Sequence, residues 1–146
     1  LQTNKAKKAV SIFDYIQTVD SIKLAQKINS SANKINKKQK IFLQINIANQ
    51  TEKPGFLTSK IISSAQEIDK YSNILIKGVM ILPPITEDKS IYLGYFKKTR
   101  EIQEAIKQKI PECKKISMGM SGDYRAAILE GTTMLRIGTR IFGERK

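Results

Sequence analysis

Along this chain a short apolar run is followed repeatedly by a longer stretch in which apolar residues recur at helical spacing. Each apolar run is bounded by capping or turn residues, which is typical of β-strands that alternate with helices. Several runs are apolar at successive positions, as in strands that are covered on both faces. The pattern predicts strands at Tyr15–Val19, Ile41–Ile47, Ile74–Leu82, Lys115–Met118 and Thr133–Ile137.

The stretches between these runs predict helices, and the opening residues also resemble the start of one. Asp20 and Ser21 are good N-caps, and apolar residues then repeat at helical spacing through Lys37. The other predicted helices cover residues 57–68 and Ser90–Lys109, the latter ended by Pro111, and a short one closes at Gly131. On the longest helix the predicted buried residues are Tyr92, Tyr95, Ile102 and Ile106.

This order of elements predicts an α/β fold. Strands that are each separated by a helix pair in parallel through right-handed crossovers. The 146 residues contain no linker, repeat or low-complexity segment, so we expect residues 1–146 to form a single domain. Two architectures remain open. Five strands are only part of an eight-stranded (β/α)8 barrel, for which about 250 residues is typical, whereas a doubly wound open sheet accepts five strands.

The missing residue types exclude several kinds of chemistry. The chain has no histidine, which excludes Ser-His-Asp and Cys-His catalysis and zinc sites that rely on imidazole. Its one cysteine, Cys113, cannot form an internal disulfide, fits a reducing cytosol and is interpreted as an ordinary thiol. No apolar run approaches the length of a membrane span. We therefore expect a cytoplasmic protein that makes no membrane contact and binds no metal.

The net charge of +13, from 26 basic and 13 acidic residues, raises the alternative of a basic nucleic-acid-binding domain. However, the basic excess is almost entirely lysine and is spread over helices and turns. Nucleic-acid sites use arginine and aromatic residues more heavily. The densest run, Lys34 to Lys40, lies between a predicted helix and a strand, where a solvated turn is expected. A solvated surface is therefore favoured over a nucleic-acid interface.

The last thirty residues carry the candidate binding chemistry. Ser117 lies near the end of the fourth predicted strand, and Gly138 and Thr139 follow the fifth. In (β/α) barrels the loops after the last two strands often form a phosphate site, because main-chain N–H groups and small hydroxyls supply several donors without bulk. Arg136 is directed to the same place. A structural ion pair is its alternative role, because burying a guanidinium without a partner is costly.

These C-terminal residues also resemble a known family. The motifs Ser117-Met-Gly-Met-Ser121, Ala126-Ala-Ile, Gly131-Thr-Thr and Arg136-Ile-Gly-Thr-Arg-Ile-Phe-Gly143 are similar to the C-terminal signature of the pyridoxal phosphate homeostasis proteins. Further matches, in order and spacing, are Thr18–Ser21, Gln44–Ile47, Lys53–Gly55 and Lys77–Met80. The opening segment, Leu1–Lys5, resembles the family's segment just after its third barrel strand.

The resemblance implies a partial (β/α)8 barrel like the alanine racemase N-terminal domain, with strands four to eight and their helices. It implies pyridoxal 5′-phosphate (PLP) as the cofactor, and a non-catalytic role in buffering it or delivering it to PLP-dependent apo-enzymes. Ser117 and the Gly138-Thr139 pair would hold the phosphate, and Arg136 would face the pyridine nitrogen. A guanidinium can only donate there, so the ring would remain unprotonated and a weak electron sink.

The resemblance further implies that the lysine forming the Schiff base lies on the first barrel strand, whereas this chain starts after the third. No lysine of this sequence is therefore assigned that role, and the chain is expected to be a truncated member of the family. One rival hypothesis is a fragment of a racemase-like enzyme, which would need a catalytic lysine and a tyrosine base from outside this sequence. Another is the product of a shortened gene that has no function.

Overall fold

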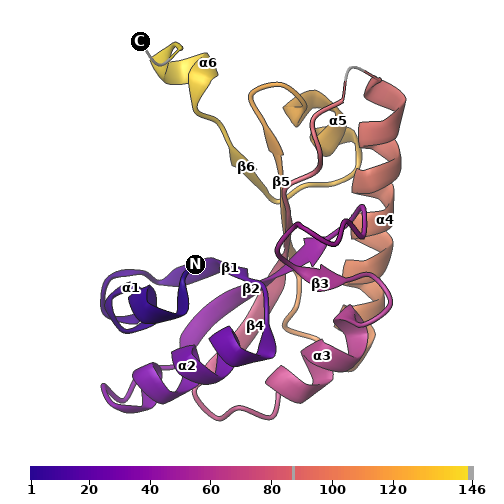
Figure 1. Ribbon diagram of the computed structural model, residues 1–146. Coiled ribbons are helices and arrows are strands. Elements are labelled where there is room, and N and C mark those ends of the chain that lie inside the picture. Colours follow the sequence, from indigo (N-terminus) through magenta and orange to yellow (C-terminus); the bar gives the residue numbers. More distant parts are fainter. Residues whose placement is uncertain (87, 145–146) are drawn as a thin grey trace.

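The computed structural model of the protein describes residues 1–86 and 88–144 and consists of parallel strands alternating with helices (Figure 1). In chain order the elements are the 3-10 helix η1 (Thr3–Lys5), α1 (Ala6–Ile12), β1 (Tyr15–Val19), α2 (Ile22–Asn33), β2 (Gln39–Asn46), β3 (Phe56–Leu57), α3 (Ile61–Ile68), β4 (Ile74–Ile81), α4 (Lys89–Lys109), β5 (Lys115–Met120), α5 (Tyr124–Leu129), β6 (Met134–Arg136) and α6 (Thr139–Phe142). The five predicted strands are all present. The two-residue strand β3 and the short helix α6 were not predicted.

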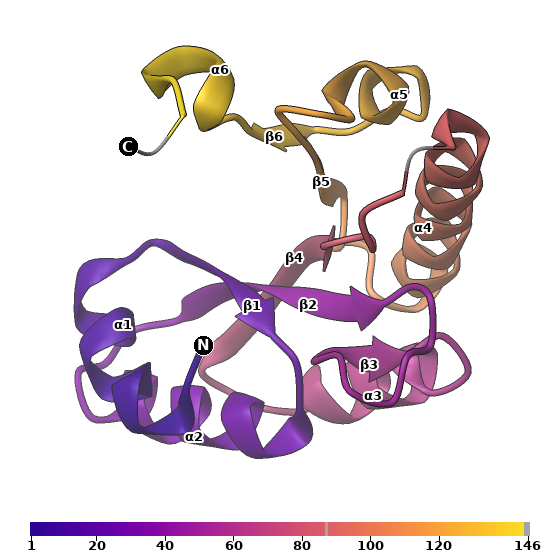
Figure 2. The same cartoon turned by 45° about the horizontal axis from the view of Figure 1, so that its top comes forward.

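The sheet has the order β1-β2-β4-β5-β6, and its pairings are parallel. Each of these strands lies beside its predecessor, whereas the strand order of a doubly wound sheet reverses at a switch point. Figure 2 shows the strands following an arc, with α1 to α5 along its outer side. The chain therefore forms part of a (β/α)8 barrel, and the doubly wound alternative is wrong.

The short strand β3 extends the sheet next to β2. Its Phe56 pairs with Ile45, just beyond the point where Val19 of β1 pairs with Leu43. Because Ile45 also pairs with Ile81 of β4 on its other edge, β3 continues the line of β1. This pairing holds the loop after β2 against the carboxyl end of the sheet.

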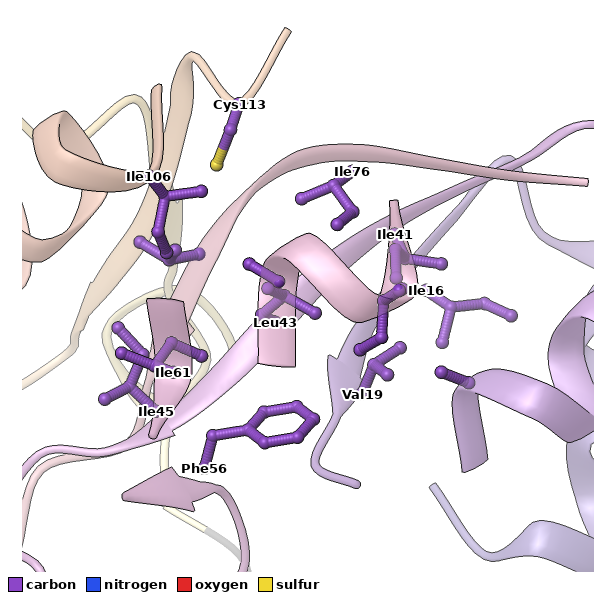
Figure 3. Packing of buried hydrophobic residues seen from close by; sticks show 14 of the residues in the cluster. Ile16, Val19, Ile41, Leu43, Ile45, Phe56, Ile61, Ile76, Ile106 and Cys113 are labelled. Atoms are coloured by element: carbon purple, nitrogen blue, oxygen red, sulfur yellow. The ribbon is translucent and has the colours of Figure 1, made fainter. Parts of the chain in front are cut away.

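The hydrophobic core lies between the strands and the helices (Figure 3). Ile41, Leu43 and Ile45 alternate along β2 toward this core, as the two-residue period of a strand requires. The opposite, inner face of the same strand carries Phe42, which packs edge-to-face against Tyr15 with ring centroids 5.9 Å apart. Both faces of the sheet therefore carry large apolar side chains, as the apolar runs in the sequence predicted.

The helix boundaries are partly as expected. The Ser21 hydroxyl accepts a hydrogen bond from the Leu24 N–H and caps α2, as predicted. However, α2 ends at Asn33 rather than Lys37, because Asn36 adopts a left-handed conformation (φ 51°). The Lys37 ammonium group then turns back to donate to the carbonyl oxygen atoms of Val10 and Phe13, both at 2.7 Å. A lysine predicted to lie in a helix therefore closes the end of α1.

The lone thiol is inaccessible. Cys113 lies just before β5 and is fully buried; burial, with a smaller contribution from Asp69, raises the pKa of its thiol to about 12. It is therefore not a nucleophile at neutral pH. Across residues 1–86 and 88–144, no cluster of three or more potential His, Cys, Asp or Glu ligands could hold a metal ion. Within the same ranges, no helix is both long enough and apolar enough to cross a membrane.

Candidate functional site

A chain of hydrogen bonds on the inner face of the sheet joins four strands. Arg136 of β6 donates through Nη1 to the Ser117 Oγ of β5 at 2.6 Å, and through Nη2 to the carbonyl oxygen of Ile81 in β4 at 2.7 Å. The Ser117 hydroxyl in turn donates to the Gln17 Oε1 of β1 at 2.7 Å. These bonds connect residues that are far apart in the sequence. They fix the Arg136 guanidinium near the carboxyl ends of the strands.

Arg136 is only half-buried, but its surroundings still shift the pKa of its guanidinium. Burial lowers the pKa of the Arg136 guanidinium, and the negative charge of Asp123 partly opposes this effect. Among the described residues, Arg136 has no carboxylate partner within ion-pair distance, so the structural ion pair considered from the sequence is not what holds it. Neutral oxygen atoms orient the guanidinium instead, and its remaining N–H groups form no further hydrogen bond within residues 1–86 and 88–144.

The predicted phosphate residues fall into two groups. Ser117 is fully buried, and its hydroxyl contacts Arg136 and Gln17, so the structure favours a role in positioning Arg136. Direct contact between Ser117 and a phosphate stays a prediction. Gly138 and Thr139 are exposed and lie at the start of α6, outside this hydrogen-bonded group. The structure therefore brings Ser117 and Arg136 into contact, and Gly138 and Thr139 follow Arg136 closely in the chain.

Ser121 is the residue that the sequence reasoning missed. Its hydroxyl accepts from the main-chain N–H of Gly138 at 3.2 Å and of Arg140 at 3.4 Å. Its carbonyl oxygen accepts from the Arg140 Nε at 3.2 Å. The signal was available: β5 ends at Met120, so Ser121 is the first residue after β5, just as Gly138 closely follows β6. The register of Met120 with Arg136 brings the two strand ends together.

The loop after β5 has its shape because of a glycine and a carboxylate. Gly119 has a φ of +94°, and a Cβ there would lie 2.7 Å from side-chain atoms of both Ala127 and Leu135. Only glycine permits this close approach of α5 and β6 without strain. The Asp123 carboxylate accepts from the Met120 N–H and closes the turn. These contacts direct Ser121 toward Gly138.

A cavity of about 360 Å³ lies at the carboxyl ends of β2 and β4, and Met120 connects its lining to the loop after β5. The Asn46 amide holds one wall. Its Nδ2 donates to the carbonyl oxygen atoms of Gln50 and Lys53, at 2.6 and 3.1 Å, and its Oδ1 accepts from the Gln50 N–H. Lys53 and Pro83 also line the cavity, which is therefore a preformed space beside the residues predicted to bind a ligand.

The whole chain, residues 1–146, matches the family model of the alanine racemase N-terminal domain. It is 35% identical to the pyridoxal phosphate homeostasis protein of Synechocystis sp. over 149 residues, which cover 99% of this chain and 67% of that protein. The chain belongs to the pyridoxal phosphate homeostasis protein family. Identity to the family member of Vibrio alginolyticus is 34%, over 99% of this chain and 62% of that protein. The chain thus spans about three fifths of the length of that relative.

Solved structures agree with this assignment. PipY of Synechococcus elongatus, solved without PLP, superposes with a TM-score of 0.91 at 31% identity, over 98% of this chain and 67% of PipY. PipY with PLP bound gives a TM-score of 0.88 at 30% identity. An alanine racemase of Clostridium difficile, 16% identical with a TM-score of 0.78, covers 99% of this chain and 40% of the racemase and shares the fold alone. The family and the partial barrel predicted from the sequence are confirmed.

Proposed function

We propose that this chain supplies the ring-binding and phosphate-binding side of a PLP site, in a protein of PLP homeostasis. The observation that carries the proposal is the Arg136 guanidinium, which is held by Ser117 and by the Ile81 carbonyl at the carboxyl ends of the strands. Ligands of (β/α) barrels bind at this end. The family's name and the PLP-bound structure of PipY point to the same cofactor.

The residues present fit this cofactor. A guanidinium has donors only, so Arg136 would donate to an unprotonated pyridine nitrogen, where a carboxylate would instead favour a protonated one. At the other end, two main-chain N–H groups converge on one oxygen atom, the Ser121 Oγ, beside the exposed hydroxyl residue Thr139. Several donors converging without bulk suit a phosphate. Gly138 and Thr139, joined by Ser121, would therefore hold the phosphate, with Ser117 orienting Arg136.

When bound, PLP supplies an aldehyde carbon and an aromatic ring that can withdraw electrons. Arg136 would keep the ring nitrogen without a proton, which weakens that withdrawal. No lysine or tyrosine of this chain is assigned to move a proton at the cofactor. We infer that the protein binds and releases PLP rather than catalysing a reaction on it, that its clients are PLP-dependent apo-enzymes, and that it acts in the cytoplasm.

The test is a titration of the chain with PLP, followed by equilibrium dialysis, for the parent protein and for Arg136→Met. A hydrogen bond from a charged group is worth about 1.5–3 kcal/mol, so we expect affinity to fall roughly 10- to 100-fold. Arg125→Met removes an exposed arginine and the same charge, and should change affinity less than about threefold. Equal losses in the two variants would show that net charge, and not the Arg136 site, attracts PLP.

A second comparison separates the two ends of the cofactor. Arg136→Met should weaken the binding of both PLP and pyridoxal, because both contain the ring. Thr139→Val should weaken PLP binding alone, since only PLP carries the phosphate. Borohydride reduction at micromolar PLP, followed by intact-mass measurement, should leave the mass at 16.5 kDa, because no lysine here is assigned a covalent role. A stoichiometric adduct on one lysine would contradict that assignment.

A further inference from the structure

Charge is unevenly distributed between the helices on the outside of the sheet. Residues 1–13 and 21–51, which include α1, α2 and the segment leading into β2, contain no aspartate or glutamate. Their lysines are Lys5, Lys7, Lys8, Lys23, Lys27, Lys34, Lys37, Lys38 and Lys40. In contrast, α4 mixes Glu101 and Glu104 with its basic residues. Much of the net positive charge is therefore concentrated on the α1–α2 part of the surface.

A groove of about 380 Å³ lies between α1 and α2 within this basic region. Its lining consists of Asn4, Lys7, Lys8, Ser11, Ser31, Lys34 and Ile35. Figures 1 and 2 both place α1 and α2 far from β6 and α6, which carry the candidate cofactor site. The groove is therefore a separate feature of the molecule.

In the described part of the chain, the lysines of the groove have no ion-pair partner. Lys37, just outside it, donates to two carbonyl oxygen atoms and closes α1. Lys7, Lys8 and Lys34 are exposed, and none of them forms an ion pair with any carboxylate of residues 1–86 and 88–144. Three cations around one groove repel one another, and an anionic partner would relieve that repulsion.

The groove also has an apolar component. Ile35 is half exposed and forms part of its lining. The hydroxyls of Ser11 and Ser31 donate to the carbonyl oxygen atoms of Lys8 and Lys27 on their own helices. They are therefore less able to donate hydrogen bonds to a ligand. Lysine charge next to an exposed aliphatic side chain suits a partner with acidic and apolar residues on one face. A nucleic-acid surface would use arginines and stacking aromatic rings instead.

We propose that the α1–α2 groove, formed by Lys7, Lys8, Lys34 and Ile35, is a docking site for an acidic amphipathic helix of a partner protein. Glutamates spaced three or four residues apart on that helix face the three lysines. A leucine or similar residue of the same face covers Ile35, in the manner of a helix bound in a groove. The proposal does not depend on PLP binding, because the groove shares no residue with the candidate cofactor site.

The probe is a fluorescein-labelled helical peptide of about 15 residues, roughly 22 Å long, with glutamates flanking a leucine stripe. Its binding to the intact chain is measured by fluorescence anisotropy. The triple substitution Lys7→Glu, Lys8→Glu, Lys34→Glu should reduce affinity at least about tenfold. The matched control, Lys97→Glu, Lys98→Glu, Lys107→Glu, changes the net charge equally on exposed positions of α4 and should cost less than about threefold.

Ile35→Ser tests the apolar contact and should weaken the peptide a few-fold while leaving the binding of a poly-glutamate peptide unchanged. Circular dichroism melts establish that each variant is folded. Equal losses in the two triple variants would overturn the proposal, because binding would then follow net charge alone. It would also be overturned if the peptide failed to bind at micromolar concentration, or if a single-stranded oligonucleotide of equal charge bound more tightly at the groove and displaced it.

Discussion

The two ends of the parallel sheet use positive charge differently. At the carboxyl end, the guanidinium of Arg136 is half-buried and held by two hydrogen bonds to other strands. Near the amino end, Lys7, Lys8 and Lys34 surround a groove without an ion-pair partner in the described residues. Arg136 offers a rigid, planar set of donors, whereas lysine offers a mobile point charge. The first arrangement suits a small ligand of fixed shape, and the second suits the acidic helix proposed for the groove.

The amino end also shows that a lysine can be as fixed as Arg136 when the chain supplies acceptors. Lys37 bonds to the carbonyl oxygen atoms of Val10 and Phe13, which are left free at the end of α1. Lys34, three residues earlier, has no such role. What separates a structural cation from a free one is therefore its acceptors, and not its residue type or its place in the lysine-rich run.

The largest effect on stability should come from a substitution between the two ends of the sheet, where β4 and β5 approach each other closely. Gly78 of β4 pairs with Lys115 of β5, and a Cβ at Gly78 would lie 2.2 Å from the Lys115 carbonyl oxygen. Gly78→Val should cost about 3 kcal/mol or more in the free energy of unfolding, measured by urea denaturation, because backbone must move. It should also lower PLP affinity, since Met80 and Ser117 pair in the same register.

Gly94→Ala is the control for Gly78→Val. Gly94 lies in α4, and a Cβ added there would have no atom of another segment within 4 Å. Alanine should therefore stabilise the helix by up to about 1 kcal/mol. If both substitutions cost the same, the tight approach of β4 to β5 would not be what the fold requires at Gly78.

The next effect should appear at the carboxyl end alone. Ser117→Ala removes the oxygen that links Arg136 to Gln17, and should cost about 2 kcal/mol because a buried, charge-assisted hydrogen bond is lost. PLP affinity should fall as well, but less than in Arg136→Met. Ser63→Ala, at an exposed position of α3, is the control and should change neither quantity. Unchanged PLP affinity in Ser117→Ala would show that Arg136 holds its place without this serine.

A smaller effect should separate two lysines at the amino end. Lys37→Met leaves two carbonyl oxygen atoms at the end of α1 without their donor, and should lower the free energy of unfolding by about 1–2 kcal/mol. Lys34→Met should lower it by less than about 0.5 kcal/mol, as is usual for an exposed side chain. Urea denaturation of both variants measures the difference. Similar values for the two would remove the distinction between a structural and a free lysine.

The last prediction concerns the pH dependence of stability. It involves Cys113, just before β5, and its effect appears only above neutral pH. Burial raises the pKa of this thiol to about 12, against about 8.5 in an unfolded chain. The folded protein keeps a proton that the unfolded chain loses, so the stabilisation is complete below about pH 8.5 and is lost as the pH rises toward 12. Between pH 9 and 10 the parent should lose about 1 kcal/mol more than Cys113→Ala, as measured by urea denaturation at each pH. Parallel pH profiles would contradict the buried thiol.

Local patterns in the sequence determined the elements and their order. Apolar runs located the five main strands, Ser21 marked the start of α2, and Pro111 followed the end of α4. The C-terminal motifs identified the family, and with it the barrel. These features could be read without coordinates because periodicity and capping depend on residues a few positions apart.

Contacts between distant segments were decided only by the tertiary structure. On α4 the predicted Ile106 is buried, but so are Phe96, Thr99 and Gln103, which were not predicted. The predicted Tyr92 and Tyr95 are only partly buried. The packing of α4 against its neighbours decides which face is buried. Because that face includes polar residues, the spacing of apolar residues alone does not identify it. Similarly, the two-residue β3 is too short to leave a pattern, and its pairing depends on where β1 leaves the edge of β2.

The same limit applies to the candidate site. The sequence by itself determined that Ser117 lies in one predicted strand and that Arg136, Gly138 and Thr139 lie at or just after the end of the next, because apolar runs locate strands. It could not determine that Ser117 contacts Arg136 while Ser121 receives the Gly138 N–H. Those partners depend on the register of β5 with β6 and on the bend at Gly119. A shift of one residue in the register would bring different side chains together.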